Sequence, residues 1–298
     1  MLAANNAYVA TQMPQRFTPP STPPQEPGAN AQQTRGLGPS ALLAPDEAPP
    51  VTVENPDSAS PFIVLCDHAH NRIPRRLNRL GLSEAVLRQH IAYDIGAAGV
   101  AHFLAHLLGA TAIFTGYSRL VIDPNRYLTD PTSIPLISDD VFIPGNEDLT
   151  EADRHARAEE IFWPYHQHVE AILSAREAGG VMPVLIAVHS FTPELKGTLR
   201  PWHIGVLSDA DRRLADPALA MLRRHGDIIV GDNEPYSAIS PRGFTLERHA
   251  NPQGRLHLLL EIRQDLIAAE TGQRAWADRL GDIAWRLLES GKAEQTIG

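Results

Sequence analysis

Short apolar runs alternate with amphipathic stretches along this chain. Runs of this length, bounded by Pro or polar residues, are typical of buried strands in a parallel sheet. We predict strands at 62–66, 110–115, 120–122, 183–188, 202–207, 227–230 and 256–262. We predict helices at 83–91, 95–108, 150–178, 211–225 and 272–290. This alternation predicts an α/β fold, a three-layer α/β/α sandwich around a mostly parallel mixed sheet.

Local signals mark several helix boundaries. Ser83 precedes Glu84 and the first amphipathic stretch, as an N-cap residue would. Thr150 is followed three residues later by Asp153, an acidic relative of the capping box. Pro164 lies inside the same helical pattern and is expected to kink it. The segment 131–146 has no periodicity, so we expect a long loop at the rim of a site.

The first fifty residues differ in composition from the rest. They hold ten of the 25 prolines, separated by Gln, Asn, Ser and Thr. Such a segment cannot bury enough apolar surface to offset the entropy of ordering it. We therefore predict a disordered tail over residues 1–55 and a single α/β domain over residues 56–298, since no later composition shift suggests two domains.

Charge and composition exclude several classes of protein. The formal net charge of -9 and the absence of a Lys/Arg run argue against nucleic-acid binding. No stretch reaches the roughly 18 consecutive apolar residues of a membrane span, and we expect no membrane partner. The single cysteine, Cys66, excludes an internal disulfide and lies in an apolar run, so we interpret it as a core thiol. With no signal-peptide pattern, we expect a cytoplasmic protein.

Two histidines and a glutamate occupy matching positions on three predicted strands. His68 and His189 each follow an apolar run, and Glu261 interrupts another near its end. The carboxyl ends of parallel strands meet at one edge of a sheet, so these side chains should converge. Two imidazoles and a carboxylate suit a metal-activated water with a general base, which makes a hydrolase the first hypothesis.

The third metal ligand and the role of the glutamate each have two interpretations. Asp94 precedes a small-residue helix, so it either caps that helix or completes a metal site with the histidines. Glu261 needs a partner because an unpaired buried carboxylate is costly. Either Arg263 or another arginine neutralises it, or it is the general base with a raised pKa.

Basic and amide side chains at strand–loop junctions suggest an acidic substrate. Arginine offers a planar fork that binds carboxylates with two hydrogen bonds. The candidate substrate-binding residues are Arg119, Arg126, Arg200, Asn233 and Arg263.

Six stretches of this chain resemble the N-formylglutamate amidohydrolase family, in the family's order and across nearly all of residues 61–290. They are Cys66-Asp67-His68-Ala69-His70-Asn71-Arg72-Ile73-Pro74, Tyr93-Asp94-Ile95-Gly96-Ala97, Ser118-Arg119-Leu120-Val121-Ile122-Asp123-Pro124-Asn125-Arg126, His189-Ser190-Phe191-Thr192-Pro193, Gly231-Asp232-Asn233-Glu234-Pro235-Tyr236 and Glu261-Ile262-Arg263-Gln264-Asp265-Leu266.

The resemblance implies a zinc-carboxypeptidase-like fold and metal-assisted cleavage of an amide, such as the formyl group of N-formylglutamate. It implies one divalent ion, zinc, held by His68 and His189, with Glu261 as the carboxylate of the last strand. Carboxypeptidase-like enzymes use His-x-x-Glu at the first corner, whereas Asn71 stands three residues after His68 here. Asp94, Asn71 and Asp67 therefore stay open as the third ligand, in what resembles a divergent branch of the family.

The leading hypothesis is a zinc-dependent amidohydrolase that acts on a small acidic N-acyl amino acid. A second hypothesis is a peptidase-like hydrolase of a cell-wall or peptide amide, with the 131–146 loop lining an open groove. A third is a metal-free binding protein on the same scaffold. Metal content and the effect of chelation on activity would separate them.

Overall fold

The structure is a computed structural model that describes residues 41–238 and 243–295, with side chains up to Glu289. Most of the predicted tail, residues 1–40, lies outside the described residues. In the part that is described, no helix combines the length and apolar character needed to cross a membrane.

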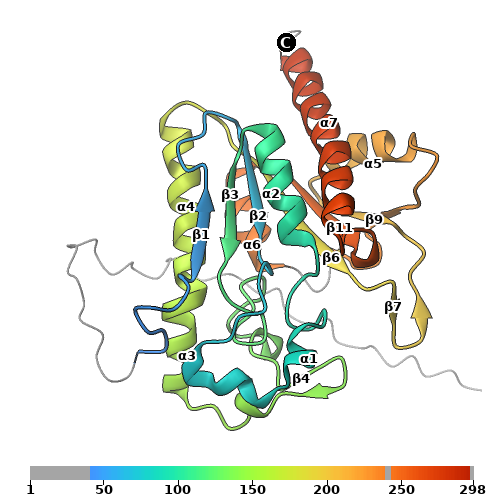
Figure 1. Cartoon of the computed structure of the whole chain (residues 1–298). Helices are drawn as coiled ribbons and strands as arrows, with labels where there is room; N and C mark the ends of the chain where they lie inside the picture. The colour runs from blue at the N-terminus through green and yellow to red at the C-terminus, as the bar shows by residue number, and fades with distance from the viewer. Residues whose placement is uncertain (1–40, 239–242, 296–298) are drawn as a thin grey trace, which may run out of the picture. The chain divides into compact units, whose positions relative to one another are not determined.

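A mixed sheet forms the centre of the fold, in the order β1-β3-β2-β6-β11-β9-β10 (Figure 1). Strands β3, β2, β6 and β11 are mutually parallel, while β1 and β9 run antiparallel to β3 and β11, and β10 is parallel to β9. The strands are β1 (Val51–Glu54), β2 (Phe62–Cys66), β3 (Thr111–Thr115), β6 (Val184–Phe191), β9 (Ile204–Leu207), β10 (Val230–Asp232) and β11 (Leu256–Arg263). This arrangement confirms the predicted α/β class with a mostly parallel, mixed sheet.

Helices cover both faces of the sheet, which explains why its central strands are apolar throughout. Val64 and Cys66 of β2 pack on the face covered by α2 (Ala97–Leu108), α5 (Ala215–Arg223) and α7 (Glu270–Gln295). Ile63 and Leu65 point the other way, toward α4 (Trp163–Ala178) and α6 (Phe244–His249). Alternate residues of a strand face opposite sides, so each strand needs apolar residues at every position. Cys66 is a fully buried, free thiol, as interpreted from the sequence.

The predicted helix starts agree with the structure. Ser83 accepts from the Val86 N–H at the start of α1 (Glu84–Leu87), and Thr150 and Asp153 form a capping box at α3 (Glu151–Arg157). A π-helical turn at Ala158–Phe162 lies between α3 and α4, and Pro164, which was expected to kink the helix, follows in the first turn of α4, so the regular hydrogen-bond ladder is interrupted just before the proline. Two short hairpins form separate two-stranded sheets outside the central sheet. They are β4 (Ile137–Ser138) with β5 (Val141–Phe142) and β7 (Glu194–Leu195) with β8 (Thr198–Leu199).

Two sequence expectations were wrong in detail. Residues 120–122 form a turn, because the Ser118 hydroxyl donates to the Ala92 carbonyl and bends the chain while Leu120 packs among other loops. The tail was expected to extend to residue 55, but Val51–Glu54 is an edge strand on β3 and Leu42 is buried. Two apolar residues facing the core, Val51 and Val53, are too short a pattern to reveal a strand whose partner is remote in sequence.

Candidate metal centre and active site

Three polar side chains come together at the carboxyl end of the sheet. His68 lies in the loop after β2, His189 is near the end of β6, and Asp94 precedes α2. The Asp94 N–H donates to the His68 carbonyl at 3.0 Å, which fixes the two loops side by side. All three side chains are buried, at 3, 5 and 3% exposed for His68, Asp94 and His189.

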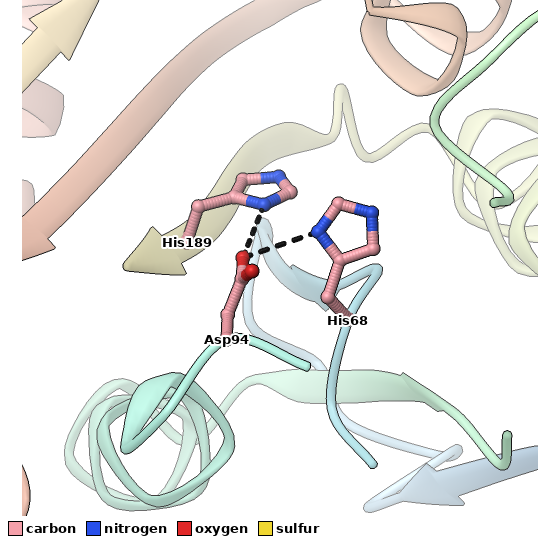
Figure 2. Close-up of side chains that lie close together, drawn as sticks. All are labelled: His68, Asp94 and His189. Carbon is pink, nitrogen blue, oxygen red and sulfur yellow. Dashed lines mark hydrogen bonds and ion pairs between the residues drawn. The ribbon is translucent and has the colours of Figure 1, made fainter. Parts of the chain in front are cut away.

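The two imidazoles share one carboxylate oxygen (Figure 2). Asp94 Oδ2 lies 3.2 Å from His68 Nδ1 and 2.8 Å from His189 Nδ1. The ring centroids are 5.0 Å apart, and one potential ligand atom from each of the three residues lies within 4.8 Å of the others. The residue at the N-cap of α2 is Gly96, so the structure does not give Asp94 the capping role. Asn71 turns away and donates to the Leu87 carbonyl.

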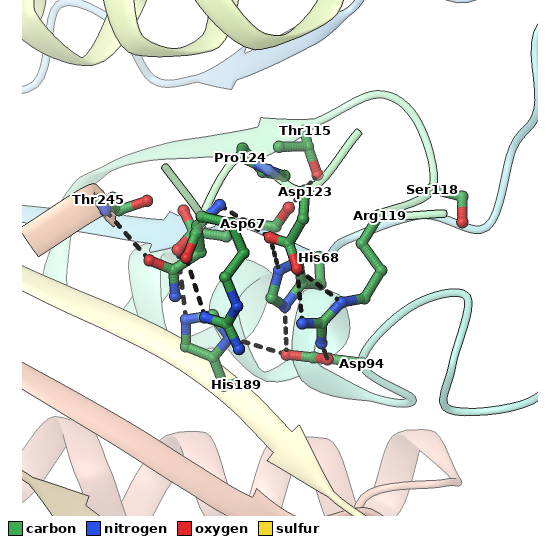
Figure 3. A network of polar contacts seen from close by, with 12 residues as sticks. Asp67, His68, Asp94, Thr115, Ser118, Arg119, Asp123, Pro124, His189 and Thr245 are labelled. Atoms are coloured by element: carbon green, nitrogen blue, oxygen red, sulfur yellow. Dashed lines mark hydrogen bonds and ion pairs between the residues drawn. The ribbon is translucent and has the colours of Figure 1, made fainter. Parts of the chain in front are cut away.

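The other nitrogen of each ring faces a second carboxylate (Figure 3). His68 Nε2 lies 2.8 Å from Asp123 Oδ1, and His189 Nε2 lies 3.3 Å from Asp67 Oδ2. Asp67 in turn accepts from the buried Tyr165 hydroxyl at 2.6 Å. Metal-binding histidines commonly have such a carboxylate partner, which orients the ring.

Asp123 is a site residue that pattern reasoning missed. Arg119 donates to its second oxygen from Nε at 3.0 Å and from Nη2 at 2.6 Å. The arginines at strand–loop junctions and the resemblance of the 118–126 stretch to the family both pointed to this segment, but the two arginines were selected as candidates and the aspartate was not. Tyr165 carried no sequence signal, since it sits in an ordinary helical pattern.

The electrostatics of the cluster follow from burial and from these pairs. Burial lowers the pKa of His189, but Asp67 and Asp94 outweigh it and hold that pKa well above the ordinary value. Burial and Arg119 lower the pKa of His68, and Asp123 and Asp94 reverse the balance so that it is raised. Ionised carboxylates can only accept, so the hydrogen bonds to Asp94 and Asp123 place protons on both nitrogens of His68 and on Nδ1 of His189.

Glu261 lies beside this cluster on the adjacent strand. It is in register with His189 across β6 and β11, is 8% exposed, and its Oε2 is buried without a hydrogen-bond partner. Burial raises its pKa to about 7, with Asp94 adding to the rise and His189 opposing it. Arg263 pairs with Asp265 at 2.8 Å instead of with Glu261. The interpretation as a structural ion pair with Arg263 therefore does not hold.

A cavity of about 440 Å³ opens onto these residues. Two of the candidate substrate-binding residues, Arg119 and Arg126, line it, as do His68, Asp94, His189 and Glu261. His90 also lines it and lies 3.3 Å from Asp139 in the β4–β5 turn, so the 131–146 segment contacts a wall residue, although none of its own residues lines the cavity.

The other three candidates are not on the cavity wall among the described residues. Arg200 donates to the Tyr236 hydroxyl at 3.0 Å and stacks on its ring at 4.8 Å. The Asn233 side-chain oxygen accepts from the Ser208 and Ala238 N–H groups and so fixes a turn. Arg263 is held by Asp265. The sequence placed these polar groups near strand ends, but local hydrogen bonds determine where they point.

Comparison with known proteins places the chain in a family. The family model described as N-formylglutamate amidohydrolase matches residues 60–268. The gene product Atu2144 from Agrobacterium tumefaciens is 38% identical, with a TM-score of 0.81 over 84% of this chain and 99% of that chain. An N-formylglutamate amidohydrolase from Ralstonia eutropha JMP134 is 21% identical, with a TM-score of 0.60 over 83% and 100% of the two chains, and supports the fold. A search of curated proteins gives no match. The chain belongs to the N-formylglutamate amidohydrolase family.

Proposed function

We propose that this protein is a metal-dependent amidohydrolase that cleaves the amide of small N-acyl amino acids, with N-formyl compounds as the first to be assayed. The observation that carries the proposal is the convergence of two buried imidazole Nδ1 atoms on one oxygen of Asp94, with Glu261 in the next strand. Two imidazoles and one carboxylate match the ligand set of catalytic zinc sites that keep a position for water.

The residues present fit a divalent cation. Three buried carboxylates, Asp67, Asp94 and Asp123, face Arg119 and the two imidazoles, which donate from Nδ1 and have raised pKa values. A divalent cation that replaced the two Nδ1 protons would leave the charge of the cluster unchanged. Asp123 and Asp67 would still orient the rings through Nε2. His68, His189 and Asp94 are thus the residues that would hold the ion.

When bound, such a cation polarises the amide carbonyl and acidifies a water molecule. Glu261 accepts the proton of the attacking water, because its raised pKa of about 7 lets it both take and return a proton near neutral pH. The same carboxyl then passes this proton to the leaving nitrogen. Arg126 lines the cavity, donates to the Asn125 carbonyl and forms no ion pair within the described residues. Its guanidinium binds the α-carboxylate of the substrate.

The test combines metal analysis with a substrate screen. Purified protein is analysed for zinc and other divalent metals, stripped with a chelator, and reloaded with one metal at a time. Hydrolysis of N-formyl, N-acetyl and N-carbamoyl amino acids is followed at each stage. We expect activity to vanish on stripping and to return with zinc. Activity that survives complete removal of metal would contradict the metal-dependent function, and binding without hydrolysis would favour a binding protein.

A further inference from the structure

The cavity continues beyond the candidate metal centre, along the sheet face that α4 and α6 cover. Ala187 and Leu259 come two residues before His189 and Glu261, and Leu207 of β9 pairs with Leu259. All three line the cavity. Residues two apart on a strand share a face and lie about 7 Å apart, so this apolar row lies directly below the row of His189 and Glu261. We call this part of the cavity the inner channel.

Oxygen atoms close the far end of the inner channel. Glu261 pairs with Gly205 and Leu259 with Leu207, so the chain moves away from Glu261 as it continues to Asp209. Asp209 lines the cavity together with Asn251. Asn251 Nδ2 donates to Asp209 Oδ2 at 3.1 Å, which leaves Asn251 Oδ1 buried and without a partner. Thr245 also lines the cavity, but its N–H donates to Asn125 Oδ1 at 3.1 Å, so it lies near Arg126 and not at this end of the channel.

The nearby cations are already paired with other carboxylates. Arg212 contacts Asp216 and Asp232, and Arg213 contacts Asp211. No ion pair of Asp209 occurs within residues 41–238 and 243–295. Asn251 Oδ1 is a buried acceptor without a donor, and the desolvation cost of such an atom would be relieved by a ligand N–H group. The half-buried Asp209 accepts only from the neutral Asp211 N–H and Asn251 Nδ2, so its negative charge stays uncompensated. The far end of the channel is therefore suited to a cationic group.

The opposite end of the cavity can hold one carboxylate. Arg119 is committed to Asp123, which leaves Arg126 as the guanidinium without a carboxylate partner on the described part of the wall. Arg126 therefore binds the α-carboxylate of an N-acyl amino acid. A second carboxylate in the inner channel would face Glu261 and Asp209 without a compensating charge.

We propose that the inner channel selects N-acyl amino acids whose side chain is aliphatic and ends in an ammonium or guanidinium group, in preference to N-formylglutamate. This inference rests on the proposed function. The row of Ala187, Leu207 and Leu259 packs against the methylene groups, and Asp209 and Asn251 accept from the terminal N–H groups.

The test compares three substrates that differ at the end of the side chain. These are N-formyl-lysine, N-formyl-norleucine, which has the same aliphatic stem without the ammonium group, and N-formylglutamate. We expect kcat/KM for the lysine compound to exceed that for the norleucine compound by about tenfold or more, as a charge-assisted hydrogen bond gives, with glutamate lowest.

Variants assign this preference to the far end of the channel. Asp209→Asn should bring the ratio of the lysine to the norleucine compound close to one. Asp232→Asn is the matched control, because Asp232 pairs with Arg212 outside the cavity, and it should keep the wild-type ratio. If Asp209→Asn does not fold, Asn251→Ala should lower the ratio in the same direction. A wild-type preference for glutamate, or an unchanged ratio in the folded variants, would overturn the proposal.

Failure of the proposed function gives a different result. In that case none of the three compounds is hydrolysed, even with zinc added. Calorimetric binding of the same compounds to Glu261→Gln protein then tests the channel without turnover. Tighter binding of the lysine compound than of the glutamate compound would support the inner channel, and equal or reversed affinities would reject it.

Discussion

Single atoms define the chemistry of this site. Asp94 Oδ2 lies within hydrogen-bonding distance of both imidazoles and, at 3.4 Å, of the Ser190 N–H. Ionised groups are costly to bury unless they are paired, and Asp94 is paired with several donors. Glu261 differs because one of its oxygens has no partner, so burial shifts its pKa upward. A carboxyl group in that state can take up and release a proton near pH 7.

The first prediction concerns Glu261→Gln. If Glu261 is the general base, the variant should keep its fold and metal while kcat falls by roughly 10²–10⁴, the usual contribution of a positioned acid–base group. KM should change little, because the group acts in the transition state. Steady-state kinetics on metal-loaded protein, with metal content measured on the same sample, gives the result. A stable, zinc-loaded and fully active variant would remove Glu261 from the mechanism.

The second prediction concerns Asp123→Asn. Asp123 accepts from His68 at one oxygen and from Arg119 at the other, whereas an asparagine side chain has only one oxygen. One of the two donors therefore loses its partner, and the His68 ring is less well oriented. Zinc affinity should fall by about 10–100-fold, the usual effect of such a partner. Competition with a chromophoric chelator measures it. Asp282→Asn, at an exposed pair with Arg286, is the control, and equal affinities in the two variants would contradict the role.

At the level of elements, a buried histidine pair joins α4 to α6. His166 Nε2 donates to the Pro124 carbonyl at 3.0 Å, so its Nδ1 accepts from His249 Nε2, also at 3.0 Å. His249 Nδ1 lies 3.0 Å from Glu170 on α4. Pro124 directly follows Asp123, so this pair also fixes the loop that orients His68. Burial, with a smaller effect of His249, lowers the pKa of His166 to about 3.

The third prediction follows from this lowered pKa. The folded pKa lies below the ordinary value of 6.5, so the native state binds fewer protons than the unfolded chain in the range between them. His166 thus contributes stability above pH 6.5 that is lost as pH falls toward 3, by about 1.4 kcal/mol per pH unit. His166→Gln, which keeps a donor but does not titrate, should show a shallower fall of Tm between pH 6.5 and 4.

The matched control for this prediction is His168→Gln on the same helix. His168 is exposed, and within the described residues its ring contacts only the Pro164 carbonyl, so its replacement should leave the dependence of Tm on pH as in the wild type. Parallel Tm curves for the wild type and His166→Gln across this pH range would show that the pair does not set the acid sensitivity.

For the whole molecule, the segment before β2 is part of the domain. The Leu42 and Leu43 N–H groups donate to the Glu160 carboxylate at 2.7 and 2.9 Å, and Leu42 is 4% exposed. Further along, β1 pairs with β3, and the Gly116 N–H donates to the Pro50 carbonyl at 2.7 Å. Residues 41–55 therefore cover an edge of the sheet and part of the core.

The fourth prediction compares two truncated chains. A chain of residues 41–298 should retain the Tm and the activity of the full chain, because its first residue precedes these contacts. A chain of residues 56–298 should lose several degrees in Tm or fail to fold, since it uncovers the edge of β3 and loses the burial of Leu42 and Val51, about 1.5–3 kcal/mol for each side chain. Differential scanning calorimetry of both would decide, and equal Tm values would contradict the docking of this segment.

The sequence alone determined which segments form the parallel strands and which strand ends carry His68, His189 and Glu261. Apolar runs bounded by polar residues report burial on both faces, and the carboxyl ends of parallel strands share one edge. These relations are local or follow from strand direction, so they needed no knowledge of sheet order. The capped starts of α1 and α3 were predictable for the same reason.

Only the tertiary structure decided the partners of these residues. Asp94 is 26 residues from His68, Asp123 is 55 residues from it, and Tyr165 is 98 residues from Asp67. Sequence periodicity gives the face on which a residue lies, but not which remote loop packs against that face. Arg263 sits at a strand end as expected, yet Asp265 binds its guanidinium, and Arg200 donates to Tyr236, which lines the cavity in its place. Side-chain direction at such junctions depends on contacts that form only when the sheet is assembled.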